Sequence, residues 1–129
     1  MRAEIEAAST RIASHVRTTP IIHLEVGAWG LVGHIVLKLE QLQHTGSFKP
    51  RGAFNSVLTS RVPEAGIIAA SGGNHGVAVA YVARQLGYPA EIFVPEVCPP
   101  VKVARLRSYG ARVTQIGATY ADALLASRE

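Results

Sequence analysis

Residues 66–94, GIIAASGGNHGVAVAYVARQLGYPAEIFV, carry the clearest signal for a fold in this sequence. Residues 66–70 form a short apolar run that is typical of a buried strand, and a glycine-rich turn follows it. Residues 74–86 predict a helix that ends at Gly87, and residues 90–94 form a second apolar run. A strand, a helix and a strand joined by short connections predict a parallel sheet with helices packed against it.

The same alternation continues toward the end of the chain. Residues 100–109 predict a helix closed by Gly110, residues 112–116 predict a strand, and residues 120–127 predict a further helix. We therefore expect an α/β fold with a mainly parallel sheet and flanking helices.

The first part of the chain follows a less regular pattern. Residues 2–15 predict an amphipathic helix, because apolar side chains recur at spacings of three and four: Ile5, Ala8, Ile12 and Val16. Residues 35–40 predict a strand, and a helix is expected from about Pro50 to residue 60, with Ser47 as a candidate cap. The turn at residues 61–64 is the best internal boundary, so we expect two parts, residues 1–61 and 62–129.

The composition is that of a folded globular protein and not of a disordered one. The chain has 129 residues, of which 48% are hydrophobic and 17% charged. The net charge of +4 comes from scattered basic residues, and aromatic residues are few and dispersed, so no nucleic-acid partner is expected. No apolar stretch reaches the length that spans a membrane, so the expected location is the cytoplasm.

Cys98 is the one cysteine of the chain, so no internal disulfide can form, which fits a reducing compartment. Its loop-like context, Val97-Cys98-Pro99-Pro100, favours a structural role over a catalytic one. The histidines show no spacing that would bind a metal together with a carboxylate or the cysteine, so no metal site is expected.

The first segment with chemical content is residues 37–53, LKLEQLQHTGSFKPRGA. A predicted strand leads into a polar loop, and the loop places Lys49 at the start of a predicted helix. The positive end of the helix dipole disfavours the ammonium form there and so favours a nucleophilic amine. Phe48 offers an apolar surface beside it. On spacing alone, a lysine that simply faces solvent is the favoured alternative.

The second segment is Ser71-Gly72-Gly73-Asn74-His75-Gly76, a glycine-rich turn between a strand and a helix. Backbone N–H groups at such a turn bind anions, and glycine lets a ligand approach the backbone closely. The spacing differs from the dinucleotide fingerprint, and no Gly-Lys-Ser/Thr follows as it would in a P-loop. An ordinary turn at a helix start is the alternative.

Together, in this order, the two segments resemble fold-type II pyridoxal-phosphate enzymes, and most closely the serine/threonine dehydratase group with its racemase relatives. The resemblance runs from about Thr19 through Val94-Pro95, Pro100-x-Lys102 and Tyr109-Gly110-Ala111 to Tyr120. It implies the N-terminal portion of a two-domain enzyme. Residues 1–61 would belong to the large cofactor-binding domain and residues 62–129 to the small domain, while the C-terminal half of the family fold lies beyond this stretch.

The resemblance also implies roles for individual residues. Lys49 would bind pyridoxal phosphate as a Schiff base and, once freed by the substrate, would take the α-proton. Phe48 would border the cofactor ring, and Asn74 would hydrogen-bond its ring hydroxyl. The substrate carboxylate would be held by the turn and the helix start, residues Ser71, Gly72, Gly73, Asn74 and His75. Loss of hydroxide from the β-carbon would then convert threonine or serine to a 2-oxo acid and ammonia.

Smaller differences bear on the reaction type. His75 after Asn74 favours dehydratases over cysteine-synthase and threonine-synthase types, which tend to carry threonine there. Position 72 is glycine where serine racemases place a serine as the second proton donor, so racemisation is expected to be poor. Two alternatives stay open: another fold-type II enzyme, either a β-replacing synthase or a racemase, and a truncated, non-catalytic module for binding or assembly.

The resemblance leaves part of the expected site unaccounted for. No tetraglycine-like loop for the cofactor phosphate occurs in this stretch, so it resembles half of an active site. We therefore expect the chain alone to be inactive and to bind the cofactor weakly, and the strand at residues 35–40 to lack its neighbours. The full-length enzyme of amino-acid metabolism is expected to take a small amino acid as its substrate and to form a homodimer or a higher homo-oligomer.

Overall fold

The computed structural model describes residues 1–128, and its centre is a three-stranded parallel sheet. The strands are β3 (Ile67–Ala70), β4 (Ala90–Val94) and β5 (Arg112–Gln115), in the order β3-β4-β5. Each strand is followed by a helix. The α/β class with a mainly parallel sheet, expected from the sequence, is therefore confirmed.

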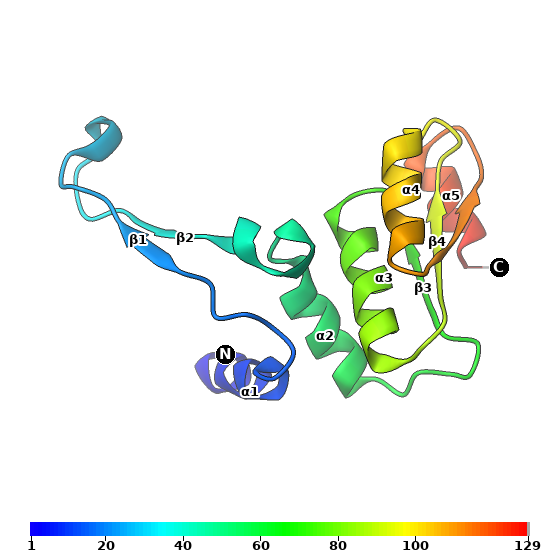
Figure 1. Ribbon diagram of the computed structural model, residues 1–129, viewed down its shortest axis with the longest axis horizontal. Helices are drawn as coiled ribbons and strands as arrows, with labels where there is room; N and C mark the ends of the chain where they lie inside the picture. The colour runs from blue at the N-terminus through cyan, green and yellow to red at the C-terminus, as the bar shows by residue number, and fades with distance from the viewer. Residues whose placement is uncertain (129) are drawn as a thin grey trace.

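Three helices cover this sheet. Helices α3 (Asn74–Leu86) and α4 (Pro100–Ser108) lie on one face, and α5 (Tyr120–Ala126) packs against the other (Figure 1). Helix α3 has the predicted bounds because Gly87 follows it in the left-handed conformation, with φ 76°. Helix α5 begins with a capping box, in which Thr119 and Asp122 satisfy each other's backbone N–H groups.

The main core lies between the sheet and helices α3 and α4. Ile92 and Val94 of β4, together with Leu106 of α4, have no exposed surface, and Val77 and Ala80 of α3 pack against them. Cys98 is buried at the edge of this cluster, which is consistent with the structural role expected for it. Because β4 is covered on both faces, its sequence is apolar almost throughout.

The N-terminal part has helices α1 (Arg2–Ile12) and α2 (Lys49–Thr59) and an antiparallel hairpin of β1 (Ile21–His23) with β2 (Val36–Lys38). Three short 3-10 turns accompany them, at Ala28–Gly30 (η1), Glu40–Leu42 (η2) and His44–Gly46 (η3). The hairpin projects away from the rest of the molecule (Figure 1). The expectation that residues 35–40 lack any neighbour is wrong, because β1 pairs with β2.

Several expected bounds and one expected cap are corrected. The first helix ends at Ile12, short of residue 15, and Ile5 is 64% exposed, so the predicted apolar stripe does not pack as a whole. Ser47 is not the residue that caps α2. The helix begins at Lys49 after Phe48, and the Ser47 hydroxyl accepts only a long hydrogen bond, 3.4 Å, from the Lys49 N–H.

A second, smaller core joins the N-terminal helices to α3. Phe54 of α2 is 1% exposed and packs with Ile12, Ala53, Ala78 and Val82. The ring of Phe54 also stacks on His15 and meets Tyr81 edge-on. Helix α2 is therefore held against α3, and the cavity described below lies beside this contact. Within residues 1–128, no helix is long and apolar enough to cross a membrane.

Candidate active site

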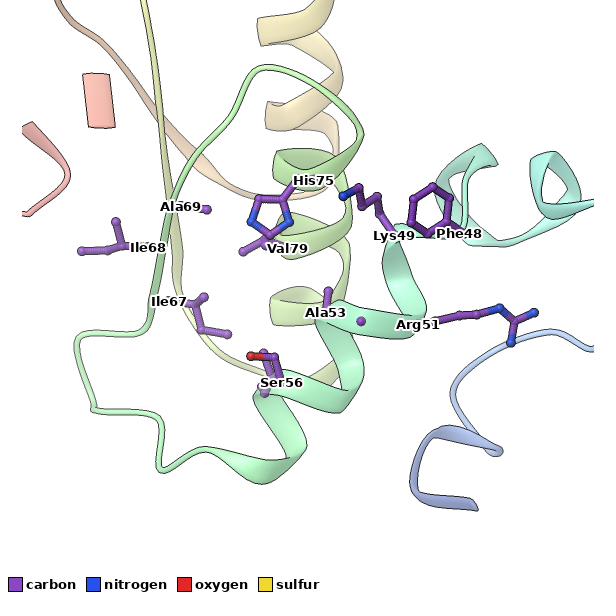
Figure 2. A pocket seen from close by; sticks show the side chains of 12 residues that line it. Phe48, Lys49, Arg51, Ala53, Ser56, Ile67, Ile68, Ala69, His75 and Val79 are labelled. Carbon is purple, nitrogen blue, oxygen red and sulfur yellow. The ribbon is translucent and has the colours of Figure 1, made fainter. Parts of the chain in front are cut away.

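A cavity of about 420 Å³ lies where α2, α3 and β3 meet (Figure 2). Its wall is mostly apolar, with Ala53 and Val57 from α2, Ile67 from β3 and Val79 from α3. Phe48, Lys49 and His75 line one end of it. A mainly apolar hollow with a few polar groups at one end is the usual form of a small-molecule site.

Lys49 is the first residue of α2, and its side chain extends toward His75 (Figure 2). Among the described residues, its Nζ has no hydrogen-bond or ion-pair partner, and it lies 5.1 Å from the centroid of the Phe48 ring. The ring of Phe48 attracts the ammonium group weakly. The amine is therefore accessible at the mouth of the cavity, where it can react with a carbonyl compound.

The loop before Lys49 is fixed by buried polar contacts. Gln43 is 2% exposed, and its amide both accepts from the Arg17 N–H (3.0 Å) and donates to the Arg17 carbonyl (2.8 Å). Thr45 has a left-handed backbone with φ 62°, and its carbonyl accepts a hydrogen bond from Arg105 of α4, 2.7 Å long. The loop is thus tied to the segment after α1 and to helix α4.

An ion pair spans the same loop. Glu40, at its start, accepts hydrogen bonds from Arg51 on both carboxylate oxygens, at 2.8 Å each, and a third from the Thr19 hydroxyl. The hydrogen bonds from Arg51 lower the pKa of Glu40 from its ordinary 4.5 to about 2, and the Thr19 bond contributes to the same lowering against the opposing effect of burial. Glu40 is therefore ionised at every physiological pH.

The second predicted segment connects β3 to α3. The Ser71 N–H donates to the Phe93 carbonyl (3.1 Å), and the Ser71 hydroxyl accepts from the Gly73 N–H (3.2 Å). A β-carbon on Gly76 would overlap the Ser71 carbonyl, so glycine is what allows α3 to start so close to the end of β3. The turn is tight, and the first N–H groups of α3 follow it.

His75 is the second residue of α3 and faces the cavity (Figure 2). Partial burial lowers the pKa of its imidazole, and the nearby charge of Lys49 lowers it further. His75 is therefore neutral at physiological pH and can accept a hydrogen bond at one ring nitrogen and donate one at the other.

The cavity brings together three of the predicted site residues, Phe48, Lys49 and His75. Ser71, Gly72, Gly73 and Asn74 form the turn and helix start that lead into His75, and they are not among the residues that line the cavity. Sequence reasoning missed the pair of Glu40 and Arg51. Both residues stand in the quoted segment, but their pairing depends on how the loop between them closes.

The chain matches the family of pyridoxal-phosphate dependent enzymes over residues 12–129. It belongs to that family. The match spans both segments on which the resemblance rested and the whole of the cavity. The cofactor of the family is therefore pyridoxal phosphate, as the sequence led us to expect.

Two relatives within the family show how far the similarity extends. The chain is 43% identical over 126 residues to an L-threonine ammonia-lyase of Geobacter sulfurreducens, covering 95% of this chain and 31% of the relative. It is 41% identical over 129 residues to the catabolic L-threonine dehydratase TdcB of Staphylococcus aureus, covering 98% of this chain and 37% of the relative. The chain spans about a third of the length of these relatives.

Solved structures of the family superpose on nearly the whole chain. Maize serine racemase gives a TM-score of 0.85 at 32% identity, covering 98% of this chain and 39% of that one. A bacterial-type comparison, the threonine deaminase of T.th., gives a TM-score of 0.84 at 39% identity, covering 98% and 40%. The architecture is therefore that of the first part of a fold-type II pyridoxal-phosphate enzyme.

The described residues fit the pyridoxal group of this cofactor. The group carries an aldehyde, which requires an amine that is not engaged elsewhere, and Lys49 provides one at the mouth of a cavity of about 420 Å³. Pockets for small molecules and cofactors are usually about 300–1,000 Å³, so the volume is adequate.

Proposed function

We propose that these residues form the N-terminal part of the active site of a lyase that removes water from threonine and serine and releases ammonia, in the full-length protein. The observation that carries the proposal is the accessible Lys49 amine at the head of α2, which faces the cavity beside His75. The names of the relatives, a threonine ammonia-lyase and a threonine dehydratase, favour this reaction over the others that the fold supports.

Each predicted residue has a distinct role in this proposal. Lys49 binds the cofactor through its amine and later takes the α-proton of the substrate, while Phe48 borders the cofactor ring. Asn74 donates to the ring hydroxyl. The turn from Ser71 through Gly72 and Gly73 to His75 holds the substrate carboxylate, because the first N–H groups of a helix have no partner within the helix.

The bound cofactor would supply an electron sink that makes the α-hydrogen acidic. Lys49 accepts that proton, and hydroxide leaves the β-carbon and is protonated to water. Addition of water to the resulting dehydrated amino acid, as its imine, releases ammonia and leaves a 2-oxo acid. The net change is one amino acid converted to one 2-oxo acid and one ammonia.

Finer features belong to the same proposal. Residues 1–61 are assigned to the large domain and residues 62–129 to the small one, and the protein is placed in the cytoplasm as a homo-oligomer. Gly72 has no hydroxyl that could deliver a proton to the opposite face of the substrate, so elimination is favoured over racemisation. The cofactor phosphate would be bound by residues outside this stretch, so the chain alone is expected to be inactive.

The test is an assay of ammonia and 2-oxo acid formation from threonine and from serine by the full-length protein. We expect product without a second substrate, and its loss in Lys49→Ala but not in Lys102→Ala, a lysine remote from the cavity. Product that appears only when a second nucleophile is added would instead identify a β-replacing synthase. Inversion of serine without ammonia release would identify a racemase.

A further inference from the structure

The guanidinium of Arg51 grips the carboxylate of Glu40 with two parallel hydrogen bonds. Nε donates to Oε2 and Nη2 donates to Oε1, each at 2.8 Å. Nη2 also donates to the Arg17 carbonyl at 3.2 Å, and the Thr19 hydroxyl donates to Glu40. Such a planar, two-point contact fixes direction as well as distance, which a single hydrogen bond does not.

The pair is largely sheltered from water. The side chains of Arg51 and Glu40 are 29% and 20% exposed. Lys38 also approaches the carboxylate, with its Nζ 3.9 Å from Glu40, and donates to the Thr19 carbonyl. Glu40 therefore offsets more than one positive charge at this place, and removal of its charge would leave Arg51 and Lys38 without this anion.

The position of Arg51 on its helix links this pair to Lys49. Both residues lie in the first turn of α2, two positions apart, and successive residues rotate by about 100° around a helix, so their side chains leave it about 200° apart. Figure 2 shows this: Lys49 points to the cavity and Arg51 points away from it. Fixing Arg51 against Glu40 thus fixes which way Lys49 faces.

A cation in the first turn of a helix is opposed by the helix dipole. Lys49 and Arg51 both stand in the first turn of α2, and that turn contains no acidic residue. Glu40 supplies the missing negative charge from the other side of the loop. The start of α2 is therefore held by a contact between residues that the loop itself brings together.

We propose that the pair of Glu40 and Arg51 is a positioning device for the cofactor lysine, which sets the rotation of α2 so that the Lys49 amine faces the cavity beside His75. The proposal rests on the proposed role of Lys49. Neither Glu40 nor Arg51 touches the reacting atoms in this account, and both act through the helix that carries the lysine.

The test uses the reaction of the lysines with pyridoxal 5'-phosphate. The chain is incubated with the compound, the adducts are reduced with borohydride, and peptide mapping gives the extent of labelling at Lys49 relative to Lys102. Lys102 is exposed on α4 and serves as the reference within each sample. Lys38 is unsuitable because it lies beside Glu40.

The variants are Glu40→Gln and Arg51→Lys, with Glu91→Gln as the matched control. Glu91 likewise pairs with an arginine, Arg112 (3.5 Å), and accepts from a threonine hydroxyl, Thr114 (2.6 Å), but on the sheet and away from Lys49. Arg51→Lys keeps the charge and removes the two-point contact, so it separates positioning from electrostatics. The circular dichroism of each variant is recorded alongside.

We expect the labelling ratio of Lys49 to Lys102 to fall about tenfold in Glu40→Gln and in Arg51→Lys, because displacement of a reactive group by even an ångström is costly. In Glu91→Gln it should stay within about twofold of the wild type, since that substitution removes a surface contact of similar kind. A fall in both variants with unchanged helical signal supports the proposal.

Two failures have different meanings. If Lys49 is labelled no more than Lys102 in the wild type, the proposed function fails along with the inference. If Lys49 is preferred in the wild type and the preference survives Glu40→Gln or Arg51→Lys, the inference alone is overturned. Loss of the helical signal in both variants also overturns it, because the pair would then hold the fold as a whole and not the lysine in particular.

Discussion

The Sγ atom of Cys98 lies 2.9 Å from the position that a β-carbon on Gly72 would occupy. Cys98 is 7% exposed and comes from the loop after β4, while Gly72 belongs to the turn that leads to His75. Real side chains essentially never approach a β-carbon so closely, so one of the two residues would have to move. The loop after β4 thus favours glycine at position 72.

Gly72→Ala is therefore expected to destabilise the chain by about 1–3 kcal/mol, the usual cost of overpacking. Cys98→Ala removes the sulfur that causes the overlap, so the double variant should be more stable than the sum of the two single changes implies, by about 1 kcal/mol or more. Urea unfolding of the four proteins measures this coupling. Additive effects would show that the sulfur and the turn do not constrain each other.

Gly76→Ala should be the more damaging change. A β-carbon there would overlap the Ser71 carbonyl, a backbone atom that cannot rotate away, and would approach the Ile92 side chain at 3.3 Å. We expect a loss of about 3 kcal/mol or more, since α3 must move off β3. Gly52→Ala in α2, where a β-carbon meets nothing within 4 Å, is the control and should be neutral or stabilising in the same urea titrations.

The ion pair at Glu40 predicts a specific acid sensitivity. Its folded pKa of about 2 lies below the ordinary 4.5, so its stabilising contribution is complete above pH 4.5 and is lost as the pH falls toward 2. That difference corresponds to at most about 3 kcal/mol. The free energy of unfolding of the wild type should therefore approach that of Glu40→Gln as the pH is lowered through this range. A constant gap between the two proteins would contradict the pairing.

Lys49 and His75 predict a second titration. Burial and the charge of Lys49 lower the pKa of His75, so Lys49→Met should raise the His75 midpoint toward its ordinary value of 6.5. His44 provides the comparison, because burial and Arg17, not Lys49, lower its pKa. Nuclear magnetic resonance of the imidazole protons against pH resolves both. An unchanged His75 midpoint in Lys49→Met would place the amine away from the imidazole.

The parallel sheet and its helices could be predicted because their signals are local. Gly87 ends α3 at the expected residue, and the apolar run at β4 marks a strand that is covered on both faces. The β1–β2 hairpin gave no such signal. Its first strand is three residues long and exposed throughout, so no alternation of buried and exposed positions exists to be read from the sequence.

The sequence by itself determined the kind of chemistry, because Lys49 and the glycine turn before His75 occur in the order that is typical of one enzyme family. Tertiary structure alone decided that Lys49 and His75 line one cavity and that Arg51 meets Glu40. The reason is physical: a helix start or a glycine turn depends on neighbours a few residues away. A cavity and an ion pair instead require packed helices and a closed loop, whose geometry no short stretch of sequence contains.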